Sequence, residues 1–252
     1  MKNIIILYKK EGETPLECLE RFRARHKKYE TIKMTYAGRL DPLASGLLLI
    51  LLGNEVKNKE EYTKLNKEYE FKVLFGFATD TYDILGKVAR AAEGKMDKRS
   101  LEKKIKNNLS YFVRKFSQPY PMYSSRTVGG KPLFAYARNK EKVKVPRKKV
   151  EITKLSFLNI KKVGAKKLLL NIEKRIKKVK GDFRQEEILK TWHKHFGPGS
   201  PKAYFLVSFR VKCSSGMYVR SLSDSLGRKL GNPALAFSIK RTKIGKFGKI
   251  RS

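Results

Sequence analysis

Apolar residues are grouped in short runs along the chain, and the spacing within each run predicts a strand or a helix. Residues 3–8 and 47–52 are continuous apolar runs typical of buried strands. In residues 68–79 the first half alternates, with Tyr69, Phe71 and Val73 on one face, which predicts a third strand. Further strands are expected at 150–162, 166–178, 204–216 and 234–247.

Three other segments have the spacing of amphipathic helices. Residues 14–28 begin with Thr14 and Glu17 at capping-box spacing. Residues 97–112 and 217–231 repeat apolar positions every three or four residues, and Gly231 suits the end of the last helix. Because strands and helices do not alternate regularly, the pattern favours an α+β fold around one large, mixed, mostly antiparallel sheet flanked by helices.

The segment 179–204 breaks the rhythm of the strands and is closed by Gly and Pro residues. We interpret it as part of a basic, helix-containing insert at about residues 172–201 of a single domain, 1–252. Its lysines are expected to contact a nucleic-acid backbone.

The charge of the chain is strongly positive. Lys and Arg number 59 against 23 Asp and Glu, which gives a formal net charge of +36. Such an excess favours a polyanionic partner, with nucleic acid first and an anionic membrane second; drift of the composition towards lysine is the alternative.

The apolar runs are too short for a signal peptide or a membrane span, so no membrane association is expected. The two cysteines, Cys18 and Cys213, lie in no CxxC pattern, which indicates a reducing cytoplasm. His193 and His195 have no cysteine or acidic cluster beside them, so we expect no metal site. The loop containing Asp80 and Asp83 lacks EF-hand spacing.

Asp41 is the most informative single residue. It lies between Leu40 and Pro42, and the proline keeps its backbone extended, before the apolar run 47–52. The local sequence alone favours an Asp-Pro turn, in which the carboxylate bonds a nearby amide. The other interpretation is a nucleophile or general base presented beside a rigid strand.

Six segments in order change this balance. They are "YKKEGETPLE" (8–17), "GRLDPLASGLLLILLG" (38–53), "KEYEF" (67–71), "TDTYDILGKV" (79–88), "PMYSSRTVGGKPLFAYAR" (121–138) and "VKCSSGMYVRSLSDSLG" (211–227). Together they resemble the motifs of the TruB family of tRNA pseudouridine synthases, over most of residues 4–245. The resemblance implies the pseudouridine synthase fold and an RNA isomerase that converts uridine to pseudouridine in tRNA, at position 55 of the T loop.

The resemblance also implies roles for individual residues. Asp41 would be the nucleophile, Tyr69 would stack on the flipped uracil, and Arg220 would pair with Asp41. An adjacent arginine keeps a carboxylate ionised and oriented, as a nucleophile requires. The residues expected to bind the substrate are Tyr36, Arg39, Tyr123, Ser124, Lys131, Tyr136, Arg138 and Ile239. Because isomerisation neither adds nor removes atoms, no cofactor is expected.

Each residue also has a simpler interpretation. Tyr69 could be an ordinary strand tyrosine, Ile239 a core residue, and Arg220 one half of a helical ion pair with Asp224. Tyr36 and Arg39 depart from the family's Gly-His-Thr-Gly turn, and "GRLD…SG" also resembles the RluA-type synthases. An RluA-like enzyme on another tRNA or rRNA site and a catalytically silent tRNA-binding protein or chaperone therefore stay as alternatives.

The expected partner is the T arm of tRNA. Since Ser252 follows soon after the last expected strand, we expect no C-terminal PUA domain, and we expect a monomer.

Overall fold

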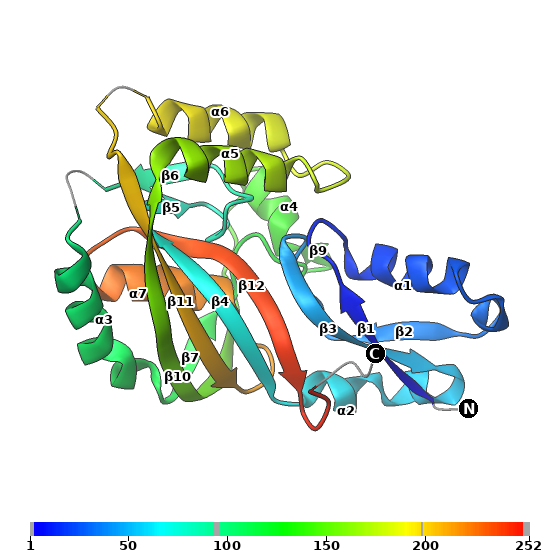
Figure 1. Cartoon of the computed structure of the whole chain (residues 1–252). Coiled ribbons are helices and arrows are strands. Elements are labelled where there is room, and N and C mark those ends of the chain that lie inside the picture. The colour runs from blue at the N-terminus through cyan, green and yellow to red at the C-terminus, as the bar shows by residue number, and fades with distance from the viewer. Residues whose placement is uncertain (1–2, 93–95, 198, 249–252) are drawn as a thin grey trace.

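The computed structural model describes residues 3–92, 96–197 and 199–248, and a long curved sheet organises them (Figure 1). The strands follow the order β1-β3-β12-β4-β11-β10-β7, and β2 pairs with β3 beside this path. Their bounds are β1 Ile4–Lys9, β2 Met34–Ala37, β3 Ala44–Leu52, β4 Lys67–Phe75, β7 Lys115–Pro119, β10 Arg147–Gly164, β11 Ala203–Cys213 and β12 Ala234–Ile244. All neighbours are antiparallel except β3 and β12, so the predicted α+β fold with a mixed, mostly antiparallel sheet is confirmed.

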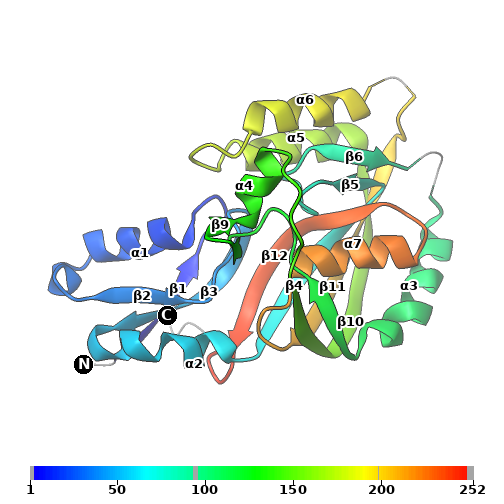
Figure 2. The same cartoon turned by 180° about the vertical axis from the view of Figure 1, so that it is seen from behind.

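Helices cover both faces of this sheet (Figures 1 and 2). The main helices are α1 Pro15–Ala24, α3 Lys98–Phe112, α5 Ala165–Ile176, α6 Gln185–His195 and α7 Val219–Lys229. Shorter elements are η1 Lys27–Tyr29, η2 Gly53–Asn58, α2 Lys59–Lys64, α4 Leu133–Arg138, the β5–β6 pair Phe77–Thr79 and Val88–Ala91, and the β8–β9 pair Thr127–Val128 and Lys131–Pro132.

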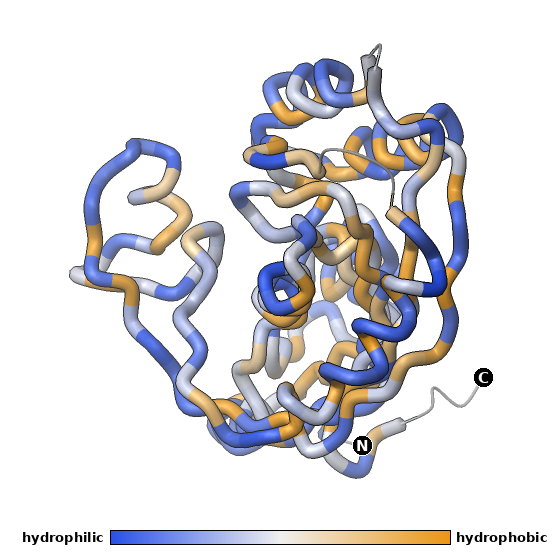
Figure 3. Tube along the Cα trace, turned by 90° about the vertical axis from the view of Figure 1, so that its left-hand side faces the viewer, coloured by the Kyte–Doolittle hydropathy of each residue, from blue (hydrophilic) through white to orange (hydrophobic). Residues whose placement is uncertain are grey.

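Alternation along β4 divides the core in two. Phe71 and Val73 belong to the cluster that includes buried residues of α3 and α7, whereas Leu74 belongs to the cluster under α5 and α6. Because successive strand residues point to opposite faces, α3 and α7 pack on one face of the sheet and α5 and α6 on the other. Along the Cα trace, apolar segments line the interior of this body and polar segments form much of its outside (Figure 3).

The predicted strand at 166–178 is wrong, because this segment forms α5. Gly164 at the end of β10 pairs with Ala203 at the start of β11, so both α5 and α6 belong to an excursion that replaces the turn between two neighbouring strands. Leu168, Ile172 and Ile176 are buried at a spacing of four residues, which fits one face of a helix. Hereafter residues 165–202 are called the helical excursion.

The parallel pairing of β3 with β12 places the candidate site. It aligns Ala44 with Ile239 and Gly46 with Arg241, so the loop before β3 lies beside the middle of β12. Gly46 has φ +113°, and a Cβ there would come within 2.2 Å of the Arg241 carbonyl oxygen. Only glycine allows this close approach of the two backbones.

Candidate active site

Asp41 lies in the loop between β2 and β3, directly before the buried apolar strand. Its carbonyl oxygen accepts a hydrogen bond from the Ala44 amide at 3.0 Å. Behind it, the Pro42 carbonyl accepts from the Gly12 amide at 2.9 Å and from the Lys9 ammonium at 3.1 Å. The loop is therefore fixed on two sides, and its carboxylate remains 37% exposed.

Lys9 is fully buried and also donates to the Ala44 carbonyl at 2.6 Å. Burial lowers the pKa of Lys9 to about 8, and the nearby carboxylates of Glu13 and Asp41 oppose this shift. The ammonium group thus holds the backbone that follows Asp41, at Pro42 and Ala44.

The Arg220 guanidinium clamps the Asp41 carboxylate with two parallel hydrogen bonds. Nε donates to Oδ2 at 2.8 Å and Nη2 to Oδ1 at 3.0 Å, although 179 residues separate the two in sequence. The Arg220 side chain is 3% exposed. A bidentate pair of this kind fixes the plane of the carboxylate.

The remaining donors of Arg220 hold two other loops. Nη1 donates to the Thr81 carbonyl at 2.8 Å, and Nη2 also donates to the Tyr123 carbonyl at 3.1 Å. Burial opposes the charge of Arg220, yet the carboxylates of Asp41 and Asp83 raise its pKa. Arg220 therefore joins α7, the loop after β5 and the segment after β7 at one point. Asp224 pairs instead with Arg228, which leaves no support for the helical ion pair of Arg220.

Asp83 is a second carboxylate beside Arg220, with 3.8 Å between its Oδ2 and Nε. Its Oδ1 accepts from the Thr81 hydroxyl at 2.7 Å and from the Leu85 amide at 3.0 Å. Burial raises the pKa of Asp83 to about 6, and Arg220 opposes the shift. In the sequence, Asp83 stands only as part of the 79–88 motif, with no role of its own.

We expect the Asp83→Asn variant to gain stability relative to the wild type as the pH rises from about 4 to about 7. The folded-state pKa of about 6 lies above the unfolded value, so ionised Asp83 costs the wild type stability above that pH. The difference in the free energy of unfolding should change by about 2–3 kcal/mol over this range. Urea denaturation at both pH values measures it; a difference independent of pH would contradict the assignment.

Tyr69, on β4, lies beside Arg241 on β12, with which it pairs in the sheet register. Burial raises the pKa of the Tyr69 phenol, and Arg241 opposes the shift. Tyr69 is 8% exposed, so the ring is packed rather than half-buried. Ile239, two residues before Arg241 in sequence, is equally buried and belongs to the same core cluster as Tyr69.

Arg241 is a buried cation that sequence reasoning missed. Nε donates to the Leu47 carbonyl at 2.8 Å and Nη1 to the Arg39 carbonyl at 3.2 Å, while Nη2 has no hydrogen-bond partner among the described residues. It ties the turn before Asp41 to β12. Lys9 and Asp83 lie within the quoted motifs 8–17 and 79–88, whereas Arg241 lies outside them, in the expected strand 234–247.

Tyr36 and Arg39, the predicted substrate-binding residues near the β2–β3 turn, lie in different surroundings. The Arg39 side chain is exposed next to Asp41. Tyr36 is half-buried and packs on the apolar cluster under α1, with the Lys59 ammonium 5.5 Å from its ring centroid. Arg39 is thus available to a ligand near Asp41, and Tyr36 supports the strand that leads to the turn.

The predicted residues between β7 and β10 are brought close to the site through Tyr123, whose carbonyl meets Arg220. Ser124 follows it and is buried. The others brace their own segment: Lys131 pairs with Glu141, the Tyr136 hydroxyl donates to the Val128 carbonyl, and Arg138 pairs with Asp182.

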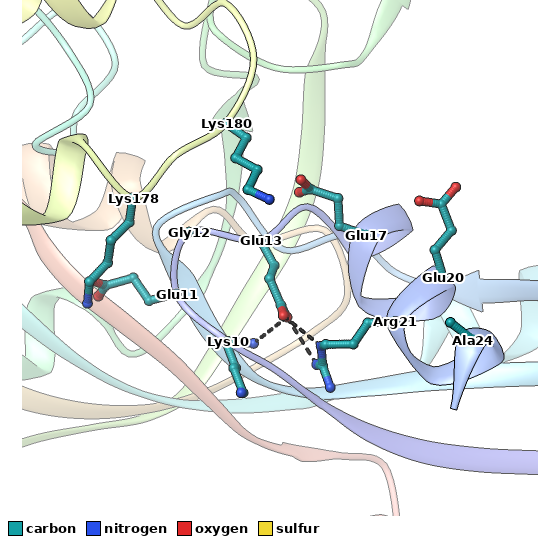
Figure 4. Close-up of a pocket in the computed structure, with 10 residues that line it drawn as sticks. All are labelled: Lys10, Glu11, Gly12, Glu13, Glu17, Glu20, Arg21, Ala24, Lys178 and Lys180. Carbon is teal, nitrogen blue, oxygen red and sulfur yellow. Dashed lines mark hydrogen bonds and ion pairs between the residues drawn. The ribbon is translucent and has the colours of Figure 1, made fainter. Parts of the chain in front are cut away.

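A hollow of about 590 Å³ lies beside the loop of residues 10–13, between β1 and α1 (Figure 4). α1 lines one side of it, and Lys178 and Lys180 of the helical excursion line the other. Its lining includes the ion pair of Arg21 with Glu13 but not Asp41. The site around Asp41 and Asp83 is therefore separate from this hollow.

Within residues 3–92, 96–197 and 199–248, no three His, Cys, Asp or Glu side chains are grouped as metal ligands. His193 lies 3.2 Å from Glu173, and His195 bonds the Thr191 carbonyl. In the same ranges, no helix combines the length and the apolar character that crossing a bilayer requires.

Known proteins give the family of this fold and site. The family model described as "TruB family pseudouridylate synthase (N terminal domain)" matches residues 26–182. The "tRNA pseudouridine synthase B" of Lactobacillus acidophilus is 32% identical over 242 residues, which cover 96% of this chain and 68% of that protein. That of Malacoplasma penetrans is 29% identical and covers 88% of this chain and 77% of the relative.

Among solved structures, a Cbf5-Nop10-Gar1 complex contains a chain with a TM-score of 0.56 and 19% identity. The likeness covers 98% of this chain and half of that one, and it shows a shared fold. Since the family model covers more than half of the sequence, the chain belongs to the TruB family of pseudouridylate synthases.

Proposed function

We propose that this protein converts uridine to pseudouridine in tRNA, at position 55 of the T loop, with Asp41 as the nucleophile. The observation that carries the proposal is the half-exposed Asp41 carboxylate held by two hydrogen bonds from the buried Arg220. Such an arrangement suits a carboxylate that must stay ionised and keep one orientation during attack. The tRNA substrate is supported by the relatives, which are named as tRNA pseudouridine synthases.

The reaction is a rearrangement within one nucleotide. Asp41 attacks the target uridine, at the base or at the sugar, and the bond between C1′ and N1 breaks. The base turns and C5 bonds to C1′, and the bond formed by Asp41 breaks, which frees its carboxylate. C5 loses its proton and N1 gains one. No atom is added or removed, so the protein has to supply a nucleophile, a platform for the base and a route for one proton.

Tyr69 is the proposed platform and Ile239 the proposed apolar contact to the uracil. Both are buried in the cluster next to Asp41, where a base flipped out of the T loop can replace its stacking in RNA. An aromatic platform contributes about 1–3 kcal/mol per base. Arg39, Lys131 and Arg138 are the proposed contacts to the RNA backbone.

The charge of the chain supports an RNA substrate more than a small molecule. At +36, the free protein carries strong self-repulsion, which bound phosphates reduce. Phosphate contacts of this kind supply affinity without sequence preference. The choice of uridine therefore depends on which RNA loop reaches Asp41.

A synthetic T-arm stem-loop that carries tritium only on C5 of the uridine at position 55 tests the function. Because C5 loses its proton in the reaction, the protein should release tritium from this RNA and leave pseudouridine at the labelled position. The same stem-loop with the label on a stem uridine serves as the control. Pseudouridine at other positions of tRNA or rRNA, but not at 55, would move the assignment to the RluA-like alternative. Binding without tritium release from any RNA would contradict the proposed activity.

A further inference from the structure

We propose that Arg184, in the helical excursion, is a positioning residue for Arg220 and therefore for the Asp41 nucleophile, an inference that rests on the proposed function. Arg184 is the N-terminal cap residue of α6 and is 14% exposed at its side chain. It makes no contact with Asp41, and its influence passes through two loops.

The Arg184 guanidinium contacts both loops at once. Its Nη1 donates to Asp80 Oδ2 at 2.9 Å, and its Cζ lies 4.2 Å from the centroid of the Tyr123 ring. A cation over an aromatic face and an ion pair of low exposure both restrict the orientation of the groups they join. Arg184 therefore fixes Asp80 and Tyr123 relative to each other.

Asp80 and Tyr123 are adjacent to the acceptors that hold Arg220. Arg220 donates to the carbonyl of Thr81, the residue after Asp80, and to the carbonyl of Tyr123 itself. Both backbone carbonyls that accept from Arg220 are thus within one residue of an Arg184 contact. A shift of either carbonyl tilts the plane of Arg220 and with it the carboxylate of Asp41.

The helical excursion is well anchored for this role. The Trp192 indole donates to the Ile84 carbonyl at 3.2 Å, and the Val88 amide donates to the Thr191 hydroxyl at 3.1 Å. Arg175, on α5, bonds Glu11 through two nitrogens and also donates to the Phe237 carbonyl. α6 is thereby attached to the middle and to the C-terminal end of the loop that contains Thr81, and α5 is attached to the segment before α1.

The Arg184 backbone is itself constrained. Its φ of 61° lies in the left-handed region, which a residue other than glycine adopts only when its contacts require it. Its amide donates to Asp182 Oδ1 at 3.0 Å, and Asp182 also accepts from Arg138 of α4. The turn before α6 is therefore connected to α4.

The test compares single-turnover kinetics of Arg184→Gln, Asp80→Asn and the double variant on the T-arm stem-loop. Asp80→Asn keeps the Oδ1 acceptor for the Lys87 amide and removes only the charge that faces Arg184. We expect Arg184→Gln to lower the chemical rate by about ten- to a hundredfold with little change in the RNA concentration at half-maximal rate. The double variant should be no slower than the slower single variant, because each substitution removes the same ion pair between Arg184 and Asp80.

Arg99→Gln is the matched control, since Arg99 is an exposed arginine of α3, on the opposite face of the sheet from α6. It should leave the chemical rate unchanged. If Arg184→Gln instead weakens RNA binding at an unchanged chemical rate, Arg184 is an RNA contact and the inference is overturned. Equal rates for Arg184→Gln and wild type overturn it too, whereas an inactive wild type on every RNA contradicts the proposed function instead. Thermal unfolding of each variant separates a lost rate from a lost fold, and Arg184→Lys should restore part of the rate through its pair with Asp80.

Discussion

Asp41→Asn is expected to lower pseudouridine formation on the T-arm stem-loop by at least about 10⁴-fold, a loss of about 5 kcal/mol or more of transition-state stabilisation. The amide keeps the size of the carboxylate but cannot act as the nucleophile, and it leaves the Arg220 guanidinium without its anionic partner. A time course of pseudouridine formation under single-turnover conditions measures the loss of rate.

The fold should survive this change, because Asp41 is 37% exposed at its side chain. Asp97→Asn is the matched control: Asp97 caps α3 through a hydrogen bond to the Ser100 amide, which asparagine can also accept. This variant should keep the wild-type rate. An Asp41→Asn protein that binds the stem-loop and forms pseudouridine at a rate within tenfold of the wild type would disprove the nucleophile assignment.

Arg220→Lys should lower both activity and stability, although the charge is kept. An ammonium group cannot make the two parallel bonds to Asp41 and also reach the carbonyls of Thr81 and Tyr123. We expect the rate to fall by about 10²–10³-fold, comparable to the loss of a preorganised donor at an active site. The free energy of unfolding should fall by about 3 kcal/mol, because the buried bidentate pair with Asp41 is broken and the carbonyls of Thr81 and Tyr123 lose their donors.

Arg228→Lys is the control for this experiment. Arg228 lies on the same helix, is exposed, and pairs with Asp224. Denaturant unfolding and the single-turnover rate should stay near the wild-type values for this variant. A normal rate for Arg220→Lys would show that the geometry of the clamp is unimportant for the chemistry.

Much of the site could be predicted because its residues lie in motifs of fixed spacing. Asp41 before a proline, Tyr69 on an alternating strand and Arg220 on an amphipathic helix are each readable locally. The structure adds what local patterns cannot carry. The choice of Asp41 over Asp224 as the partner of Arg220 depends on a contact across 179 residues. The roles of individual residues in catalysis stay predictions.

The error at 166–178 has a local cause. Three consecutive leucines, from Leu168 to Leu170, resemble a strand core, and short apolar runs do not distinguish helix from strand. No side chain caps the start of α5, so the signal that identified α1 is absent there. The helical periodicity becomes clear only when Ile172 and Ile176 are counted with Leu168. The contact of Arg184 with Asp80 and Tyr123 likewise depends on where α6 packs, which no local pattern contains.

The parallel pairing of β3 with β12 has a consequence for the order of assembly. The Arg241 guanidinium bonds the Leu47 carbonyl across 194 residues, so β3 is translated long before its neighbour on that side. At usual rates of synthesis this delay is about 10–40 s. During that time β3 is paired with β1 and, at residues 49–52, with β2, but residues 44–46 lack the partner that β12 supplies. An unpaired strand edge is prone to aggregation. A ribosome-bound chain that stops before β12 should therefore bind chaperones through the start of β3, around residues 44–48, and catalytic competence should arise only when the last strand is released.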